Sequence, residues 1–147
     1  MNPMIVEEDI VERLRQKVTL VPMANIMTIQ GLAGQQGKMP LPCIYVLPDD
    51  SFFNEDVDPD QGGSVQVEHQ NWWVSIHVQH INDLTKPSAS VLAGSIMEQV
   101  YGALVGFRPR KGFMPMAYRG RSETFLDPGF AQFPMRWETG MVLVGDN

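Results

Sequence analysis

The sequence predicts an α+β domain in which two helices pack on one face of a mostly antiparallel β-sheet. Two segments repeat apolar residues every four positions, several others alternate apolar and polar residues, and prolines and glycines separate them. The chain has 147 residues, 44% hydrophobic and 19% charged, which fits one folded domain over 1–147. Neither a membrane span nor a signal peptide is expected, because long apolar runs are missing.

The first helix is expected from Asn2 to about Val18. Asn2 is a good N-cap residue and Pro3 suits the first helical position. Acidic residues lie near the start and basic residues near the end, which matches the helix dipole. The predicted buried stripe repeats at i+4 and consists of Val6, Ile10, Leu14 and Val18.

Two strands, each followed by a loop, are expected between residues 26 and 63. Ile26 to Ile29 is expected to be a short strand, followed by a glycine- and proline-rich loop over 31–42. Cys43 to Leu47 predicts a buried strand with prolines at both ends. An acidic loop is expected over Asp49 to Gly63, with Phe52 and Phe53 exposed.

Residues 64–81 carry the clearest strand pattern. Apolar residues fall at odd numbers at Val65 and Val67, but at even numbers from Trp72 to Val78. A strand of period two cannot change faces without a bulge or a turn near residues 69–71. The segment is therefore either a hairpin or one long bulged strand, and the sequence leaves both open.

A second helix is expected over Lys86 to Gly106, with an i+4 stripe that begins at Leu92 and with Val91 beside it. A short strand over Phe113 to Tyr118 and a turn-rich stretch through Gly129 follow. The last strand is expected over Phe133 to Val144. Its apolar face consists of Met135, Trp137, Thr139, Met141 and Leu143, with Arg136 and Glu138 on the opposite face.

Two segments imitate ligand-binding motifs but fail on spacing. Gly31 to Met39 has one residue too many between its first and last glycine for a phosphate loop, and Met39 stands where a magnesium-binding Ser or Thr belongs. Asp56, Asp58 and Asp60 alternate as in a calcium loop, but the glycine comes one place late and the bidentate Glu is missing. We therefore expect no cofactor and no metal.

The histidines and the single cysteine give no case for catalysis. His77 and His80 differ in parity, and His69 lies too far along a strand from His77 to share a metal with it. We expect half-exposed strand histidines. Cys43 begins an apolar strand and is expected to be buried, whereas a nucleophilic thiol needs exposure and an activating base. We predict that the protein is not an enzyme and has no catalytic residue.

Charge is unevenly distributed along a chain with a net charge of −6. No Lys or Arg falls between Met39 and Thr85, where acidic residues gather, and basic residues return from Arg108 onward. The net charge disfavours general affinity for nucleic acid or an anionic membrane. Either these segments are two solvated loops, or the acidic loop of one subunit meets the basic loop of the next in a head-to-tail ring. The candidate subunit or partner interface consists of Asp49, Asp50, Phe52, Phe53, Asp56, Asp58, Arg108, Arg110, Lys111, Arg119 and Arg121.

The order of these elements resembles the tail terminator proteins of long-tailed bacteriophages, which include the minor tail protein U of lambda-like phages. The resemblance covers nearly the whole chain. It rests on the helix ending ERLRQKV (Glu12 to Val18), on CIYVLPDD (Cys43 to Asp50), on VEHQNWWVSIHVQ (Val67 to Gln79), on the helix opening PSAS (Pro87 to Ser90) and on the strand MRWETGMVLV (Met135 to Val144).

This resemblance implies a structural protein of the virion, assembled in the host cytoplasm. Such proteins form a homohexameric ring, in some cases from monomers, at the head-proximal end of the tail. The ring caps the tube built from the tail tube protein, ends its polymerisation and offers a surface to the head completion protein. DNA only passes through the lumen, and an acidic lumen would let it pass without sticking. Neutralising Asp49, Asp50, Asp56 and Asp58 should then slow DNA ejection.

Partner contacts are expected in the loops at 31–42 and 108–131.

Two other interpretations fit the same sequence. A head–tail connector, tail-completion or tube subunit of the same particle has a similar size and class. The second interpretation is a small enzyme or ligand-binding α+β domain. Such a domain would need an apolar pocket with convergent polar groups, which nothing in the sequence predicts.

Overall fold

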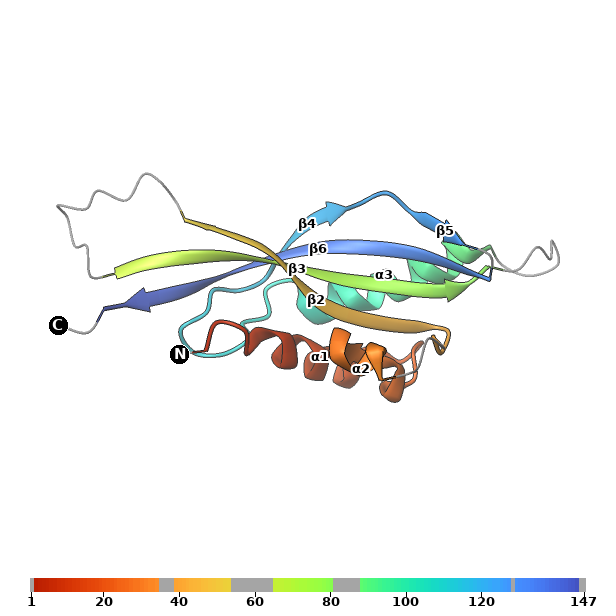
Figure 1. Cartoon of the computed structure of the whole chain (residues 1–147), viewed down its shortest axis with the longest axis horizontal. Helices are drawn as coiled ribbons and strands as arrows, with labels where there is room; N and C mark the ends of the chain where they lie inside the picture. The colour runs from red at the N-terminus through yellow and green to blue at the C-terminus, as the bar shows by residue number, and fades with distance from the viewer. Residues whose placement is uncertain (1, 35–38, 54–64, 81–87, 128, 146–147) are drawn as a thin grey trace.

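The computed structural model describes residues 2–34, 39–53, 65–80, 88–127 and 129–145. Helices form one layer and strands the other (Figure 1). The elements in chain order are α1 (Val6–Lys17), the 3-10 turn η1 (Met23–Asn25), β1 (Ile26–Thr28), α2 (Ile29–Ala33), β2 (Cys43–Phe53), β3 (Val65–Gln79), α3 (Ala89–Leu104), β4 (Ala117–Arg121), β5 (Phe125–Asp127) and β6 (Phe130–Val144).

Within the described residues the sheet has six strands: five follow the order β1-β2-β3-β6-β4, and β5 also pairs with β6. β1 and β2 run parallel, and the other pairs are antiparallel. α1 and α3 lie against the same face, where their buried residues join those of β2, β3 and β6 in one hydrophobic core. The predicted α+β class, with helices on one face of a mostly antiparallel sheet, is therefore confirmed. No helix among the described residues is long and apolar enough to span a membrane.

α1 buries the stripe that its i+4 spacing predicts, and all four stripe residues are buried. Its first turn is acidic and its last turn is basic, as predicted. The helix begins later than expected, however, because residues 3–5 form a turn and the N-cap position is Ile5. The side-chain oxygen of Asn2 accepts a hydrogen bond from the Met4 amide at 2.9 Å, so Asn2 caps that preceding turn instead.

β1 confirms the predicted short strand, but the loop expected after it begins with a helix. Ile29–Ala33 forms α2, and the hydroxyl of Thr28 accepts a hydrogen bond from the Gly31 amide at 3.3 Å. This N-cap allows a helical turn despite the glycine within it. Ile29 was predicted in the strand and instead begins α2 with its side chain exposed.

β2 is longer than predicted, because it continues through Pro48 to Phe53. Asp49 to Phe53 therefore belongs to a strand, and the prediction of a loop from Asp49 is wrong there; residues 54–64 lie outside the described residues. Pro48 is tolerated because β1 pairs only with residues 44–46, which leaves this part of β2 at the sheet edge. The register with β3 shifts between Pro48 and Ser51, so the bulge lies at the two aspartates of β2.

β3 is one strand, which decides between the two possibilities that the sequence left open. It pairs with β6 in a single register from Val65↔Val144 to Gln79↔Phe130, with no bulge between them. The apolar residues change parity because the apolar side chains of the two halves of the strand lie on different faces of the sheet, and only those of the second half are buried. Trp72 points into the core beneath the helices, whereas Val67 lies on the opposite face beside Met114.

α3 begins after Ser88, whose hydroxyl accepts a hydrogen bond from the Val91 amide at 3.2 Å. The expected start at Lys86 falls on residues outside the described ranges. Gly106 follows the helix with a φ of 75°, which fits the predicted C-terminal glycine. Val91 and Leu92 are exposed, so the predicted apolar stripe is buried only from Ile96 onward.

The strands after α3 differ from the prediction at their ends. β4 begins at Ala117, and Phe113 makes only an isolated bridge with Met141, so the predicted strand over Phe113 to Tyr118 is mostly wrong. β5 lies within the stretch predicted as turns. β6 begins at Phe130, before the predicted start, and its alternation of buried and half-buried residues is as predicted.

The distal ends of β2, β3 and β6 run past α1 and α3 toward the left of Figure 1. We call residues 51–53, 65–69 and 140–144 the arm. The 15 residues of β3 span roughly 50 Å at the usual rise of a strand. The 16 residues of α3 span only about 24 Å at the rise of a helix. The helices therefore cover about half of the sheet's length.

Candidate functional site

The sheet face turned away from α1 and α3, here called the open face, combines aromatic and charged side chains. The registers of β2, β3 and β6 bring every second residue of these strands to this face. Its members include Tyr45, Leu47, Phe52, His69, Asn71, Trp73, Ser75, His77, Gln132, Arg136 and Glu138. Aromatic residues and arginine are enriched at protein interfaces.

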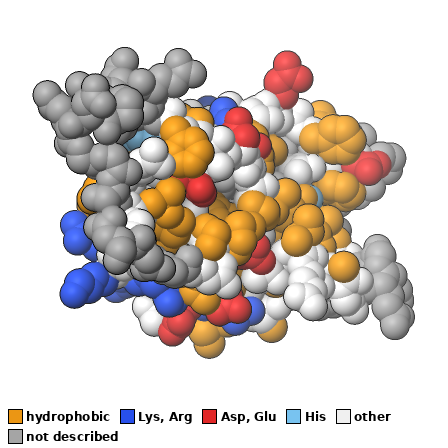
Figure 2. Space-filling model, turned by 60° about the vertical axis from the view of Figure 1, so that its left-hand side comes forward, with side chains coloured by type: hydrophobic (Ala, Val, Ile, Leu, Met, Phe, Trp, Pro, Cys, Tyr) orange, Lys and Arg blue, Asp and Glu red, His pale blue; other side chains and the backbone are white. Residues whose placement is uncertain are grey.

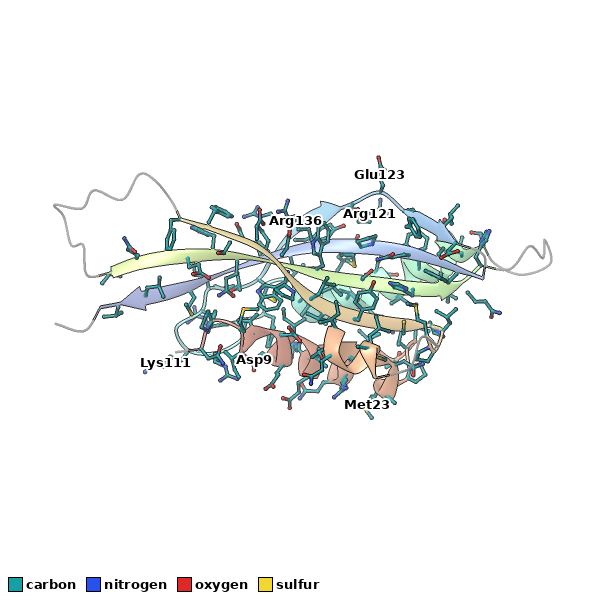
Figure 3. All side chains as sticks on the ribbon, in the orientation of Figure 1. Asp9, Met23, Lys111, Arg121, Glu123 and Arg136 are labelled. Carbon is teal, nitrogen blue, oxygen red and sulfur yellow. The ribbon has the colours of Figure 1, made fainter. Side chains whose placement is uncertain are left out.

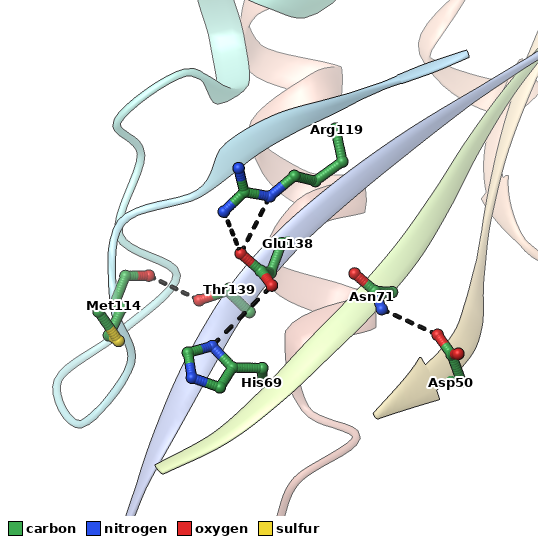
Figure 4. A network of polar contacts seen from close by, with 7 residues as sticks. All are labelled: Asp50, His69, Asn71, Met114, Arg119, Glu138 and Thr139. Atoms are coloured by element: carbon green, nitrogen blue, oxygen red, sulfur yellow. Dashed lines mark hydrogen bonds and ion pairs between the residues drawn. The ribbon is translucent and has the colours of Figure 1, made fainter. Parts of the chain in front are cut away.

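Glu138 of β6 is the centre of one polar network on the open face (Figure 4). Arg119 of β4 donates from Nε to Oε2 of Glu138 at 3.1 Å and from Nη2 to the same oxygen. Nδ1 of His69 lies 3.9 Å from the other carboxylate oxygen. The adjacent Thr139 hydroxyl donates to the carbonyl oxygen of Met114 at 2.6 Å. These contacts tie β3, β4, β6 and the loop before β4 together.

Arg136 is the centre of a second network, two residues earlier on β6. Its Nη2 lies 3.0 Å from Oδ2 of Asp49 and 2.9 Å from Oδ1 of Asp50. Its guanidinium carbon lies 5.7 Å from the ring centroid of Trp73, within the range of a cation–π interaction. The Asn71 amide donates to Asp50 at 2.8 Å, and this bond together with Arg136 holds the pKa of the Asp50 carboxyl below its usual value. Figure 3 shows Arg136 on the side of the sheet away from Asp9 and Met23.

A hollow of ≈ 510 Å³ lies between the two networks. Its lining consists of Asp50, Phe52, Asn71, Arg119, Arg136 and Glu138. The charged groups of this lining bond to one another within the chain, so they leave no single charge aimed at a small ligand. The hollow is therefore a weak candidate for a ligand site.

The acidic and aromatic candidates from the sequence lie on β2. Asp49 and Asp50 occupy the bulge, and Phe52 stacks on His69 with ring centroids 4.9 Å apart. Phe53 is also exposed, on the opposite face of the arm. Asp56 and Asp58 lie outside the described residues.

The basic candidates are divided between a loop and a strand. Arg110 forms a two-bonded ion pair with Asp9 of α1, at 2.7 and 2.6 Å, and these bonds raise the pKa of its guanidinium. Arg119 and Arg121 are on β4, and Arg121 contacts the sulfur of Met97 at 3.8 Å. Arg108 and Lys111 share the loop of Arg110 and are exposed. The structure therefore joins Arg119 to the open face and places Arg110 on the helix side, and their role in an interface stays a prediction.

Arg136 and Glu138 were not predicted as site residues from the sequence. The sequence feature that could have indicated them is a pair of charged residues at alternate positions of an otherwise apolar strand. Their partners come from β2, β3 and β4, which are distant in sequence, so the networks require the strand order.

Cys43 and His77 are cross-strand partners, which the sequence did not predict. His77 is 1% exposed, between the rings of Tyr45 and Phe130, so the prediction of a half-exposed histidine is wrong here. Burial lowers the pKa of His77 to about 4 and raises the pKa of the Cys43 thiol to about 12. Both side chains are neutral at pH 7, whereas a cysteine nucleophile reacts as its thiolate. Cys43 is buried as predicted.

Metal-binding groups do not gather in the described ranges, where no cluster of three His, Cys, Asp or Glu side chains has the geometry to hold an ion. A second hollow of ≈ 600 Å³ lies beside β4 and α3. Its lining consists of Tyr101, Tyr118, Gly120, Arg121, Ser122, Glu123, Thr124 and Phe133.

The fold and the open face together define a small α+β protein whose main candidate site is a broad surface for other proteins. The chain belongs to the phage tail terminator protein family, whose model matches residues 1–146. This match confirms the resemblance to the tail terminator proteins of phages. The family is one of structural proteins, so the chain is a structural component of the phage tail, resides in the virion and associates with other tail components. A search of curated proteins finds no match to the chain.

Proposed function

We propose that the chain forms a homohexameric ring at the head-proximal end of the tail. The ring caps the finished tube, ends polymerisation of the tail tube protein and presents a surface to the head completion protein. The family match over residues 1–146 carries this proposal. The open face supports it, because a ring subunit needs broad surfaces for its neighbours and for the tube.

The charge of the chain fits a ring through which DNA passes. A subunit with a net charge of −6 gives a strongly acidic assembly. Acidic surface around the lumen repels the DNA backbone and prevents it from sticking.

Electron microscopy of tails from phage lacking this gene tests the proposal. We expect abnormally long tails without heads, because nothing stops the growth of the tube. Supplying the wild-type gene in trans should restore normal length. Tails of normal length that fail to join heads would assign the chain to the head–tail connector instead. Normal, infectious particles would refute a structural role at this junction.

A further inference from the structure

The hollow beside β4 and α3 is not used by the proposed function. Its volume of ≈ 600 Å³ lies within the range of ligand-binding pockets. The rings of Tyr101 on α3 and Tyr118 on β4 form part of its lining, with their centroids 5.0 Å apart. Tyr118 is opposite Trp137, which belongs to the core, so this hollow lies on the helix side of the sheet. It is therefore separate from the two networks of the open face.

A β-bulge in β4 turns Arg121 toward this hollow. Tyr118 lies opposite Trp137 of β6. Arg121, three residues later on β4, lies opposite Met135, which is only two residues away on β6. Without the extra residue, Tyr118 and Arg121 would point to opposite faces of the sheet. Gly120 within the bulge has a φ of 98°, which favours glycine. Bulges of this kind re-aim side chains, and this one brings Arg121 to the face of Tyr118.

The hollow gathers hydrogen-bond donors and has one carboxylate in its lining. Burial raises the pKa of Tyr118 to about 12; the neighbouring Tyr101 adds to this shift and Arg121 opposes it, so the three polar ends lie close together. The Tyr118 hydroxyl stays protonated at neutral pH and can donate a hydrogen bond. Nη1 of Arg121 lies 3.8 Å from the sulfur of Met97 on α3. The carboxylate is that of Glu123, which points outward in Figure 3.

Arg121 differs from other arginines of the chain in having no carboxylate partner. Arg110, Arg119 and Arg136 each form an ion pair. Arg121 forms none with the described residues, Glu123 included. Exposure alone would not distinguish it, because Figure 2 shows a group of basic side chains exposed together at one end of the visible face. A guanidinium beside two phenol groups in a hollow, however, fits a carboxylate, which accepts several hydrogen bonds at once.

β4 also has an open strand edge beside the hollow. It is the last strand in the sheet order and lies at the border of the sheet in Figure 1. The loop after α3 bonds to the backbone of Met116, just before the strand. From Ala117 to Arg121, no backbone hydrogen bond joins the outer edge of β4 to the described part of the chain. An extended segment can add to such an edge, and its side chain opposite Arg121 then lies on the same face as Arg121.

We propose that the edge of β4 binds an extended segment of another tail protein chain, and that the hollow receives an acidic side chain of this segment. The carboxylate pairs with the guanidinium of Arg121 and accepts hydrogen bonds from the tyrosine hydroxyls. The hollow is larger than one carboxylate, which leaves room for the main chain of the segment beside Ser122 and Thr124 of the lining. The chain associates with other tail components, so such segments are at hand. This contact does not depend on a ring or on its position in the tail.

Photocross-linking on assembled tails tests this contact. Benzoylphenylalanine replaces Thr124, an exposed residue of the lining. Irradiation should join it to a segment of another chain that contains Asp or Glu, identified by mass spectrometry. Adding Arg121→Gln should lower the yield about fivefold or more, because a charge-assisted pair is lost. Arg108→Gln is the matched control, since it removes an exposed cation outside the hollow and should leave the yield unchanged.

Arg121→Lys separates the role of the charge from that of packing. Lysine keeps a long stem and a positive charge, so its yield should fall less than that of Arg121→Gln. Far-ultraviolet circular dichroism checks that each variant is folded. An unchanged yield in Arg121→Gln, a joined segment without an acidic residue, or tails that carry the chain but give no product would each overturn the contact and leave the proposed function standing. Absence of the chain from tails would refute the proposed function itself.

A small carboxylate is the other source of the same chemistry, and N-acetyl-L-phenylalanine is its probe. The carboxylate form should raise the melting temperature of the isolated protein more than the amide form does, and Arg121→Gln should remove this difference. Equal effects of the acid and the amide would overturn the assignment of a carboxylate to the hollow. Stabilisation by the acid without any cross-linked partner on tails would assign the hollow to a small molecule and overturn the peptide contact.

Discussion

His77 shows how a polar residue on the open face is tied to the stability of the fold. Its ring is buried, and its pKa of about 4 lies below the usual value of 6.5 expected in the unfolded chain. Because the folded state disfavours the imidazolium, the stability contributed by the neutral ring is complete above pH 6.5. It is lost as the pH falls through about 4.

The expected result is a pH-dependent difference between wild type and His77→Gln. Between pH 7 and pH 4 the wild type should lose on the order of 3 kcal/mol more unfolding free energy than the variant, which has no imidazole to protonate. Urea denaturation at both pH values measures this difference. Carboxylates titrate in both proteins, so their effect cancels in the comparison. Equal losses would show that His77 is solvated in the folded protein.

Gly140 packs where the loop before β4 meets the arm. A Cβ at this position would lie 2.7 Å from the sulfur of Met114 and 3.0 Å from a methyl of Val67. The sulfur of Met114 belongs to a flexible, 43% exposed side chain that can move aside, but the Val67 methyl on the neighbouring strand must also give way, so Gly140→Ala should destabilise the fold by about 1 kcal/mol through overpacking. Gly102→Ala is the matched control, since its Cβ would meet no atom within 4 Å on α3, and it should stabilise by about 0.5–1 kcal/mol. Urea denaturation of both variants would contradict this account if the two shifts had the same sign.

At the scale of elements, the start of α3 depends on one side chain. The Ser88 hydroxyl accepts a hydrogen bond from the Val91 amide, which otherwise lacks a partner at the helix start. Ser88→Ala should lower the unfolding free energy by about 1 kcal/mol. Ser90→Ala, two residues later within the helix, should change it little, because alanine favours helices. Thermal unfolding followed at 222 nm compares the two, and equal destabilisation would refute a capping role for Ser88.

The sequence predicted those elements whose apolar period continues through the whole element. The i+4 stripe of α1 and the alternation in β6 were both confirmed, because each buries one continuous face. β2 was predicted too short, since Pro48 usually ends a strand but is compatible with an edge position. In β3 the parity change was attributed to a bulge or a turn, and the structure has neither between β3 and β6, because the apolar side chains change faces between the body and the arm.

The candidate surface was predicted only in part. Asp49, Asp50 and Phe52 are indeed near one another on the open face, as the compact acidic segment indicated. Arg136, the partner of both aspartates, comes from a strand more than 80 residues later, which only the β2-β3-β6 order brings close. Charge along a single sequence reveals local clusters, but it does not reveal which cross-strand pairs neutralise them.

At the scale of the whole molecule, charge bears on the passage of DNA. The chain carries −6, and six copies in the proposed ring multiply this value. Asp49 and Asp50 are paired with Arg136, so removing both carboxylates leaves that guanidinium without its partners. The local surface then changes from acidic to basic, whereas the same change of net charge elsewhere leaves the open face as it is.

This difference predicts the behaviour of phage that carry a doubly neutralised subunit. If the open face contributes to the lumen of the ring, Asp49→Asn with Asp50→Asn should slow DNA ejection and lower the titre, because an exposed arginine binds the passing phosphates. Glu98→Gln with Glu123→Gln removes the same charge from exposed positions on α3 and after β4, and should leave ejection unchanged. Ejection kinetics measured at low and high salt should differ most at low salt, where screening is weak. Equal kinetics for both double variants would place the open face outside the lumen, where its charges act on neighbouring subunits.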